Sequence, residues 1–434
     1  MKKVLVSAYF FMGGSSMGDI RVRRALRNLH RHGYKPVIVT HDRNRDQWPA
    51  SDDYELVPVR GLDLAKAYRR LRGREGSFAP APAAGPKDLV SMRTGFSTWI
   101  KQWLLVPDPQ MLWGPAALRA AREVLRRERV DAVYASLAPR TDMRVATRVA
   151  AEFGLPCVVE YRDLWTSNFY DNLKAPTPLH RWLHARMERT AIRRATRITC
   201  VSTGLADYLR ARYADLRPEI SVDYGFFDPA EYPPRPPREP GRPLTVSYVG
   251  KFYFSRQPGV FLEGLRRFVE RTGIRPGQFR FQWLGEIIGV DRLRETVEAM
   301  GLGPFVEYYG HVPHRQAIET LTRSDVALIV QAPQDTIHIP GKIYEAMGAR
   351  TPILYISPPF EGTEIVERTG AGLCCPHDAE AVGETLARFR AHREQGGPWP
   401  FREDEVRRFD KDVFLARLAV LFDQAIADHA TLPA

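Results

Sequence analysis

The sequence predicts an α/β protein built from two Rossmann-like, doubly wound domains in tandem. The chain has 434 residues, which is enough for two domains that each bury a full core. Short apolar segments alternate with amphipathic segments along most of the chain. Seven prolines between residues 229 and 243 form a stiff linker that separates two such series.

The composition limits the classes of function. Hydrophobic residues make up 44% and charged residues 26%, which is ordinary for a soluble protein, and no apolar run approaches the roughly 18 residues of a membrane helix. The four cysteines show no CxxC spacing, so we expect thiols in a reducing cytoplasm. The net charge of +12 fits nucleic acid, anionic lipid or phosphorylated small molecules. No motif supports nucleic acid, so we expect no such partner.

The chain begins with the β-loop-α-β pattern of a doubly wound domain. Residues 4–9 form a continuously apolar strand, an amphipathic helix ends at Gly33, and residues 36–40 form the next strand. The Gly- and Ser-rich loop over residues 11–19 lacks the GxGxxG dinucleotide fingerprint. It is either a tight turn or the lining of a cleft at the sheet's carboxyl edge, where Gly14 would contact a bound sugar.

Residues 69–104 differ in composition from the segments on either side. A low-complexity stretch over residues 73–86 is flanked by basic residues with aromatic residues interleaved. This pattern is a candidate contact with an anionic membrane surface. Alternatively, Trp99, Trp103 and Leu104 pack into the core.

The alternation then continues to the end of the first domain. The expected elements are a helix over 115–129, a strand over 132–135, a helix over 142–153, and then strand 156–160, helix 179–195 and strand 197–202. Arg162, Asp163 and Trp165 follow strand 156–160, at the edge of an open sheet where ligands bind. Arg162 and Asp163 are either a structural ion pair or a polyol-binding pair. The flat ring of Trp165, suited to stacking on a sugar, favours the second interpretation.

The second domain repeats the pattern. The expected elements are strands over 245–249, 280–284, 306–308, 326–330 and 353–356, and helices over 259–272, 291–300, about 314–321 and 379–393, with a further short helix that begins at 340–341. A final amphipathic helix over 412–427 is long enough to return to the first domain. We therefore assign residues 1–228 to the first domain, 229–243 to the linker, 244–410 to the second domain and 411–434 to the returning helix. A cleft is expected between the two domains.

Residues 340–345 (Pro-Gly-Lys-Ile-Tyr-Glu) predict a helix aimed at a ligand. Pro340 and Gly341 are typical of a helix start, where unpaired N–H groups suit a phosphate. Lys342 opposes the helix dipole, which makes sense if an anion lies beside it. Glu345, one turn further on, can accept hydrogen bonds from two sugar hydroxyls. The alternative is a solvated, charged helix face.

Several motifs in order resemble the family-4 group of glycosyltransferases with the GT-B fold, over nearly the whole chain. After the Gly-rich first loop and its helix, they are residues 161–166 (Tyr-Arg-Asp-Leu-Trp-Thr), 225–228 (Gly-Phe-Phe-Asp), 249–251 (Val-Gly-Lys) with Arg256, 310–313 (Gly-His-Val-Pro) and 340–345. The resemblance implies a nucleotide-diphosphate-sugar donor, with UDP as the expected nucleotide. It also implies a reaction that retains anomeric configuration and needs neither a metal nor a cofactor.

The resemblance also implies roles for particular residues. Lys251 and Arg256 keep the family's spacing of a basic pair that clamps the diphosphate, a task that cations suit when no metal is used. Glu345 matches the glutamate that holds the ribose, and Gly250, Val312, Gly341 and Lys342 also fall at the donor. The acceptor belongs to the first domain, where Gly14, Arg162, Asp163 and Trp165 lie and where Asp163 is taken as catalytic.

The resemblance further implies a saccharide or lipid-linked saccharide acceptor, as in bacterial surface polysaccharide synthesis. The enzyme would then work in the cytoplasm, at the inner face of the membrane.

Three departures separate this chain from the family pattern. Ile337 replaces the first glutamate of the Glu-x7-Glu motif, and Asp335 or His338 could substitute for it. Tyr224 replaces the asparagine that normally precedes Gly225, and residues 136–140 carry no counterpart of a family histidine. The alternative functions are a nucleotide-sugar epimerase of the same fold and a non-catalytic binder driven by the positive charge.

Overall fold

The structure is a computed structural model whose chain divides into two compact units. The first comprises Met1–Tyr224 and Phe414–Ala434, and the second comprises Gly225–Val413. The structure describes residues 1–11, 17–42, 45, 48, 51–61, 103–166, 177–216, 218–237, 239, 241–252, 257–285 and 290–431. Residues 229–243, expected as a linker, lie within the range of the second unit, and the division falls inside the last helix.

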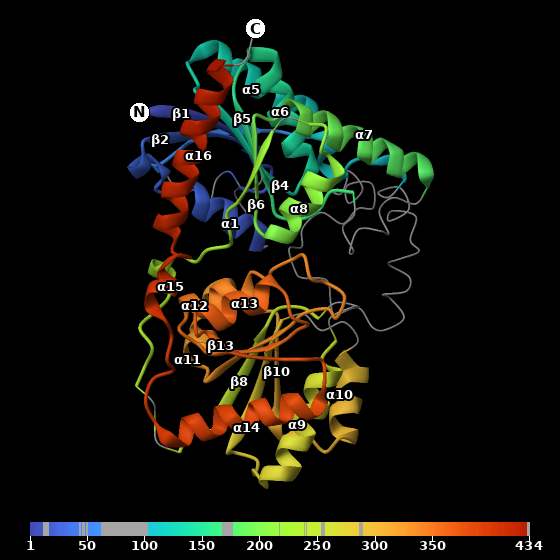
Figure 1. Cartoon of the computed structure of the whole chain (residues 1–434), viewed down its shortest axis with the longest axis vertical. Coiled ribbons are helices and arrows are strands. Elements are labelled where there is room, and N and C mark those ends of the chain that lie inside the picture. Colours follow the sequence, from blue (N-terminus) through green and yellow to red (C-terminus); the bar gives the residue numbers. More distant parts are fainter. Residues whose placement is uncertain are drawn as a thin grey trace. The chain divides into compact units, whose positions relative to one another are not determined.

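The first unit is built on a parallel sheet of seven strands in the order β3-β2-β1-β4-β5-β6-β7 (Figure 1). Its strands are β1 (Lys2–Ser7), β2 (Tyr34–His41), β3 (Glu55–Val59), β4 (Ala132–Leu137), β5 (Cys157–Tyr161), β6 (Arg197–Cys200) and β7 (Glu219–Val222). Its described α-helices are α1 (Met17–Leu26), α5 (Gly114–Arg127), α6 (Arg140–Phe153), α7 (Pro178–Arg194), α8 (Thr203–Arg212) and α16 (Lys411–Thr431), the last beginning at the unit boundary. The strand order reverses between β1 and β4, which is where a doubly wound sheet opens a crevice.

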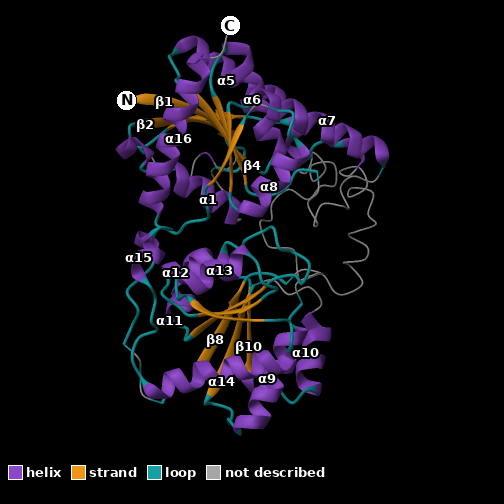
Figure 2. Ribbon diagram, viewed as in Figure 1, coloured by secondary structure: helices purple, strands orange, loops and turns teal. Residues whose placement is uncertain are grey.

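The second unit has a six-stranded parallel sheet in the order β10-β9-β8-β11-β12-β13, with helices on both faces (Figure 2). Its strands are β8 (Leu244–Val249), β9 (Phe279–Leu284), β10 (Val306–Gly310), β11 (Val326–Val330), β12 (Ile353–Ile356) and β13 (Gly372–Cys375). Its described α-helices are α9 (Gly259–Thr272), α10 (Val290–Ala299), α11 (His314–Arg323), α12 (Lys342–Gly348), α13 (Glu361–Arg368), α14 (Ala379–Gln395) and α15 (Glu403–Arg407). The order reverses between β8 and β11.

The central strands form because their residues are apolar on both faces. In β11, Val326–Val330 is buried throughout, as a parallel strand covered by helices on both sides requires. The core of the second unit joins such strands to the inner faces of α9 and α14 through residues including Phe261, Phe268 and Leu386. The predicted fold class, with two Rossmann-like domains, is thus confirmed.

The last helix completes the first unit. Within α16, the ring of Phe422 lies 5.1 Å from that of Tyr34 in β2 and 5.7 Å from that of Tyr134 in β4. Asp423 accepts a hydrogen bond of 2.7 Å from the Tyr34 hydroxyl, and Asp428 contacts Arg197 at 2.5 Å. The helix that we expected over residues 412–427 is therefore an integral part of the first core.

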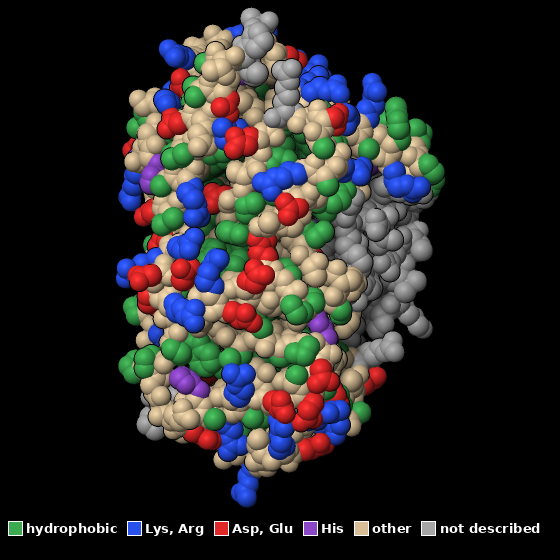
Figure 3. Space-filling model, in the orientation of Figure 1, with side chains coloured by type: hydrophobic (Ala, Val, Ile, Leu, Met, Phe, Trp, Pro, Cys, Tyr) green, Lys and Arg blue, Asp and Glu red, His purple; other side chains and the backbone are tan. Residues whose placement is uncertain are grey.

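Surface charge and cysteine burial follow ordinary patterns. Lysine, arginine and carboxylate side chains are interspersed over the face drawn in Figure 3, so the positive charge does not gather in a single patch there. Cys157, Cys200 and Cys375 are buried thiols. Among the described helices, none has both the length and the apolar character needed to cross a membrane.

Candidate functional site

The carboxyl end of β8 brings a lysine against bare backbone. Lys342, the first residue of α12, places its Nζ 3.8 Å from the centre of the buried Tyr248 ring. A Cβ at Gly250 would lie 2.9 Å from Lys342 Cε and 3.0 Å from its Nζ. Lys342 therefore lies at the end of β8, beside the switch point of the second sheet, although 92 positions separate it from Gly250 in the sequence.

Glycines keep side chains away from this edge of the sheet. Gly250 adopts φ +124° and Gly285, after β9, adopts φ +145°, a region that other residues rarely enter. The Gly250 amide donates to Leu284 O at 2.7 Å, and a Cβ at Gly285 would lie 2.1 Å from Gly250 O. The two glycines thus allow the main chain at Gly250, the main chain at Gly285 and the Lys342 side chain to pack closely together at this edge of the sheet.

Glu345 lies one turn along α12 from Lys342. Its side chain is buried, and Oε2 accepts a hydrogen bond of 2.7 Å from the Tyr232 hydroxyl. The Tyr232 ring also lies against Gly348, where a Cβ would be 2.5 Å from Tyr232 Cε2. Tyr232 therefore holds the Glu345 carboxylate in one orientation, which excludes the expected alternative of a fully solvated helix face.

Residues around Ile337 form a hydrogen-bonded loop between β11 and α12. Asp335 Oδ1 accepts from the His338 backbone N–H at 3.1 Å and contacts His338 Nδ1 at 2.9 Å. The buried Gln331 amide donates to Asp335 O and His338 O, both at 2.9 Å. Asp335 and His338, the two expected substitutes for the missing glutamate, are therefore neighbours in a fixed loop that leads into α12.

The other expected donor residues that the structure describes lie next to β8, α12 and β10. Lys251 follows Gly250 and is exposed, and its carbonyl accepts from the Tyr248 hydroxyl at 2.9 Å. Gly341 directly precedes α12, and Val312 lies half-buried between β10 and α11, two strands from β8. Arg256 lies outside the described residues.

In the first unit, Arg162 is bound by main-chain oxygens. Its Nε donates to Leu137 O at 2.9 Å and its NH2 to Ala138 O at 2.8 Å, both at the end of β4. A Cβ at Gly18 would lie 2.4 Å from Arg162 NH1. Arg162 thus joins β4, β5 and α1, and among the described residues it forms no ion pair with Asp163, which is exposed.

Trp165 is not available for stacking on a sugar. Its side chain is 2% exposed, and its indole N–H donates to His184 Nδ1 at 3.0 Å. Thr166 beside it donates to the buried Glu188 at 2.6 Å. The segment after β5 is therefore anchored on α7, and the expectation of an open aromatic face at Trp165 is wrong because packing against α7 buries the ring.

Sequence reasoning missed a buried carboxylate at the switch point of the first sheet. Asp142, in the first turn of α6, accepts hydrogen bonds from Ser7 Oγ at 2.9 Å and from the Tyr9 backbone N–H at 3.0 Å. Burial raises the pKa of Asp142 to about 7, although both hydrogen bonds oppose that change. Its position just after β4, at the reversal of strand order, is the sequence signal that could have identified it.

A second buried network stands beside Asp142. Glu160 of β5 accepts from Arg21 NH2 at 2.6 Å and from the Tyr134 hydroxyl at 3.1 Å, and it also contacts Ser136. Burial would raise the pKa of Glu160, but the charge of Arg21 holds it below the ordinary value. This network fixes α1 to the centre of the sheet.

Two expectations fall wholly or mostly on undescribed residues. Gly14 lies outside the described residues, as do residues 69–102 of the basic and aromatic stretch, Trp99 among them. Of that stretch, Leu104 is 64% exposed and Trp103 is also exposed, so these two do not pack into the core. The Trp103 carbonyl lies 3.0 Å from His180 Nε2 of α7.

The arrangement in the second unit suits an anionic ligand that carries hydroxyl groups. Lys342 offers a cation beside the half-buried main chain of Gly250, and Glu345 offers acceptor oxygens one turn away. Cations bind phosphate oxygens, and carboxylates bind neighbouring hydroxyls. The order of these groups along α12 corresponds to phosphate and then sugar.

Comparisons with known families match both units. The model described as a glycosyl transferase 4-like domain matches residues 19–222. The model described as glycosyl transferases group 1 matches residues 243–391. No curated protein sequence matches the chain significantly.

Solved structures of the same fold span the whole chain. Sucrose-phosphate synthase from Thermosynechococcus elongatus is 14% identical with a TM-score of 0.65, and the match covers 98% of this chain and 100% of that one. Anabaena HepE in complex with UDP and glucose is 14% identical with a TM-score of 0.60, covering 98% and 100%. The α,α-trehalose-phosphate synthase (UDP-forming) from Burkholderia vietnamiensis is 14% identical with a TM-score of 0.60, covering 98% and 99%. At these identities the likeness shows the GT-B fold.

Proposed function

The chain belongs to the glycosyltransferases that combine a 4-like domain with a group 1 domain, and on this premise we propose that it transfers a sugar from a UDP-sugar to a saccharide or lipid-linked saccharide. The family resemblance inferred from the sequence motifs is thereby confirmed. Retention of anomeric configuration, independence from metals and cofactors, and a role in cell-surface polysaccharide synthesis are parts of the same proposal. UDP is favoured because HepE, a structural neighbour, was solved with UDP and glucose.

The observation that carries the proposal is the position of Lys342 against Gly250. A diphosphate at the carboxyl end of β8 would meet this ammonium group and the bare main chain together. The ribose would then reach Glu345, whose carboxylate Tyr232 holds in place. A nucleotide diphosphate fits this order of groups.

Lys342 and Lys251 would also act during the reaction. Negative charge grows on the diphosphate as the glycosidic bond breaks, and fixed cations lower the barrier by stabilising that charge. We include Arg256 in this role on the family spacing alone. Asp335 and His338, in the loop that leads into α12, are the proposed contacts of the donor sugar.

The acceptor is assigned to the first unit. Asp163 is exposed after β5, on a segment that Trp165 and Thr166 anchor to α7, so its carboxylate is presented from a rigid support. We propose that Asp163 contacts the reacting saccharide. Arg162 would act indirectly, by holding the ends of β4 and β5 together.

A lipid-linked acceptor would bring the chain to the cytoplasmic face of a membrane. Leu104 and Trp103 are exposed, as are Leu179 and Trp182 on α7. The Arg186 guanidinium lies 5.6 Å from the Trp182 ring centre, so cationic and aromatic groups are adjacent on this helix. Such a surface suits an anionic bilayer. Flotation with anionic vesicles should recover the wild-type chain and lose Trp182→Ala, and equal recovery of both would remove α7 from the proposal.

A thermal-shift panel tests the donor site. UDP, GDP, ADP and CMP are added to the wild-type chain, to Glu345→Ala and to Glu364→Ala, an exposed glutamate of α13 that serves as the matched control. A ligand at a hundred times its Kd stabilises by about 2.7 kcal/mol. We expect UDP to raise the Tm of the wild type and the control but not of Glu345→Ala. Absence of a shift with every nucleotide would refute the site.

Product analysis tests the chemistry. NMR of the reaction with a UDP-sugar should show a new glycosidic bond with the donor's anomeric configuration, in the presence of a chelator. Inverted configuration or chelator sensitivity would overturn those parts of the proposal. Conversion of the donor without any acceptor would indicate an epimerase instead.

A further inference from the structure

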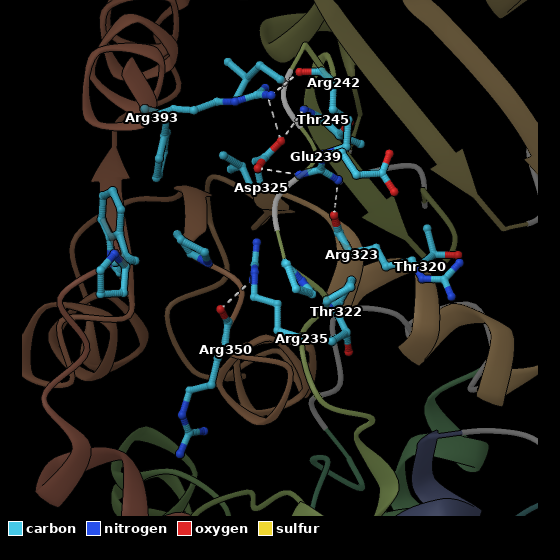
Figure 4. Close-up of a pocket in the computed structure, with 18 of the residues that line it drawn as sticks. Arg235, Glu239, Arg242, Thr245, Thr320, Thr322, Arg323, Asp325, Arg350 and Arg393 are labelled. Atoms are coloured by element: carbon cyan, nitrogen blue, oxygen red, sulfur yellow. Dashed lines mark hydrogen bonds and ion pairs between the residues drawn. The ribbon is translucent and has the colours of Figure 1, made fainter. Parts of the chain in front are cut away.

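The second unit contains a large cavity at the edge of its sheet opposite to Lys342. The cavity measures about 1210 Å³ and is lined at the start of β8 by Leu244 and Thr245, and at the start of β11 by Val326 (Figure 4). Thr245 and Gly250 stand at opposite ends of β8, roughly 16 Å apart at the usual rise per residue. Sites for small ligands typically measure about 300–1000 Å³, so the cavity is large enough to hold one. It is separate from the proposed donor site.

The charged residues of the cavity are mainly arginines. Six arginines line it against four carboxylates: Arg235, Arg242, Arg280, Arg323, Arg350 and Arg393, with Glu239, Glu319, Asp325 and Glu403. In Figure 4, Arg393 and Arg323 mark opposite sides, and Arg242 and Asp325 lie between them. Arg393 and Arg242 both contact Asp325, and Arg242 also donates to the Arg323 carbonyl, so these residues form one connected part of the cavity wall.

Four of these arginines have structural partners. Arg242 contacts Asp325 Oδ1 at 2.7 Å, and Arg393 contacts Asp325 Oδ2 at 3.3 Å. Arg235 donates to Arg350 O at 2.8 Å, just after the end of α12, and Arg350 contacts Glu403 at 2.8 Å. Cations at the ends of helices stabilise the last carbonyl groups, so these contacts need no ligand.

Arg323 and Arg280 are held by fewer or longer contacts than the other four arginines. Arg323, the last residue of α11, makes no side-chain hydrogen bond or ion pair with any residue that the structure describes. Arg280 in β9 contacts Glu307 at 3.7 Å and donates from NH2 to Thr245 Oγ1 at 3.5 Å, but its buried Nε has no hydrogen-bond partner among the described residues. His392 also lines the cavity, and its Nε2 is likewise buried without a hydrogen-bond partner among the described residues. Since unsatisfied buried polar groups are costly, oxygen atoms of a ligand or of water should complete Arg280 Nε and His392 Nε2, whereas the exposed Arg323 side chain is open to solvent and to a ligand.

Aromatic side chains supply another part of the lining. Trp399 lies 4.8 Å from the His392 ring and 5.0 Å from the Phe389 ring, between ring centres, and all three line the cavity. Tyr309 also lines it and is exposed. Aromatic faces bind the C–H faces of sugar rings, whereas guanidinium groups bind phosphate.

We propose that this cavity binds a small phosphorylated carbohydrate, with its phosphate at Arg280 and Arg323 and its ring towards the aromatic lining. The site is independent of the proposed donor site, and α12 lies between them with Lys342 at one end and the Arg350 carbonyl near the other. The matched control is Arg315→Gln, because Arg315 is an exposed arginine on the same helix as Arg323 and pairs with Glu319.

Isothermal titration calorimetry of the full chain tests the proposal. Glucose 6-phosphate, glucose and inorganic phosphate are titrated with and without excess UDP. We expect glucose 6-phosphate to bind more tightly than either fragment, and to the same extent with UDP present. The Kd should rise at least about tenfold in Arg280→Gln/Arg323→Gln and change little in Arg315→Gln.

Several outcomes would overturn the proposal. They are no heat with any of the three probes at millimolar concentration, binding that UDP abolishes, and equal affinity in the double variant. Should the double variant fail to fold, Arg323→Gln alone decides, because the Arg323 side chain is exposed and makes no hydrogen bond or ion pair with a described residue, so we expect its replacement to leave the fold intact. Failure of UDP to bind would concern the donor site only, since the titrations without UDP still test the cavity.

Discussion

Replacing Gly250 by alanine should weaken donor binding by displacing Lys342. The new Cβ would stand 2.9 Å from Lys342 Cε and 3.0 Å from its Nζ, closer than carbon atoms normally approach, so the lysine must move. A hydrogen bond to a charged group contributes about 1.5–3 kcal/mol. Loss of the contact between Lys342 and the diphosphate should therefore raise the Kd for UDP about 10- to 100-fold. Isothermal titration calorimetry measures this change.

A double-mutant cycle separates this mechanism from backbone strain. If Gly250→Ala acts through Lys342, adding it to Lys342→Ala should change the affinity little further. Gly277→Ala is the matched control, because Gly277 also has positive φ (+87°) but has open space around it. The reasoning is refuted if Gly250→Ala binds UDP like the wild type, or if its effect adds fully to that of Lys342→Ala.

Three further predictions concern buried polar groups. The pKa of Asp142 is raised from 3.8 to about 7, so its contribution to stability is full below about pH 4 and is lost as the pH rises through 7, by about 4 kcal/mol in all. About 1.5 kcal/mol of this is already lost at pH 5, where the unfolded carboxyl is ionised, so urea unfolding at pH 5 and pH 8 should differ by about 2.5 kcal/mol in the wild type but not in Asp142→Asn, and equal losses would contradict it. Tyr232→Phe removes the hydrogen bond to Glu345 and should raise the Kd for UDP about 3- to 10-fold in calorimetry. An effect larger than that of Glu345→Ala would contradict the proposal that Tyr232 acts only by holding Glu345. Glu160→Gln removes the buried carboxylate that Arg21 contacts and should lower the free energy of unfolding by about 3–5 kcal/mol, whereas a loss below 1 kcal/mol would count against the ion pair.

The sequence predicts the central strands well and the edge strands poorly. Strands β8 and β11 are apolar on both faces, so their positions were expected to within a residue at each end. Strands β3, β7 and β13 were not expected, and all three lie at the edge of a sheet. Edge strands are short and partly exposed, as the half-buried residues of β7 show, so their pattern resembles that of a loop.

The candidate site divides in a similar way. Local spacing along α12 was enough to place Lys342 and Glu345 one turn apart. The contact of Lys342 with Gly250 depends on the pairing of distant segments, and the use of Arg162 depends on main-chain carbonyls, which no side-chain pattern reveals. The burial of Trp165 likewise depends on His184, a residue of a different element.

The position of α16 has a consequence for biosynthesis. The second unit is continuous in sequence, from Gly225 to Val413, whereas the first unit needs residues from both sides of it. During translation, the second unit can therefore fold before α16 leaves the ribosome. Until then, the rings of Tyr34 and Tyr134 lack the cover that Phe422 provides. The first unit is thus synthesised first but completes its fold last. In a nascent chain, the face that α16 later covers would be the last to need protection by chaperones.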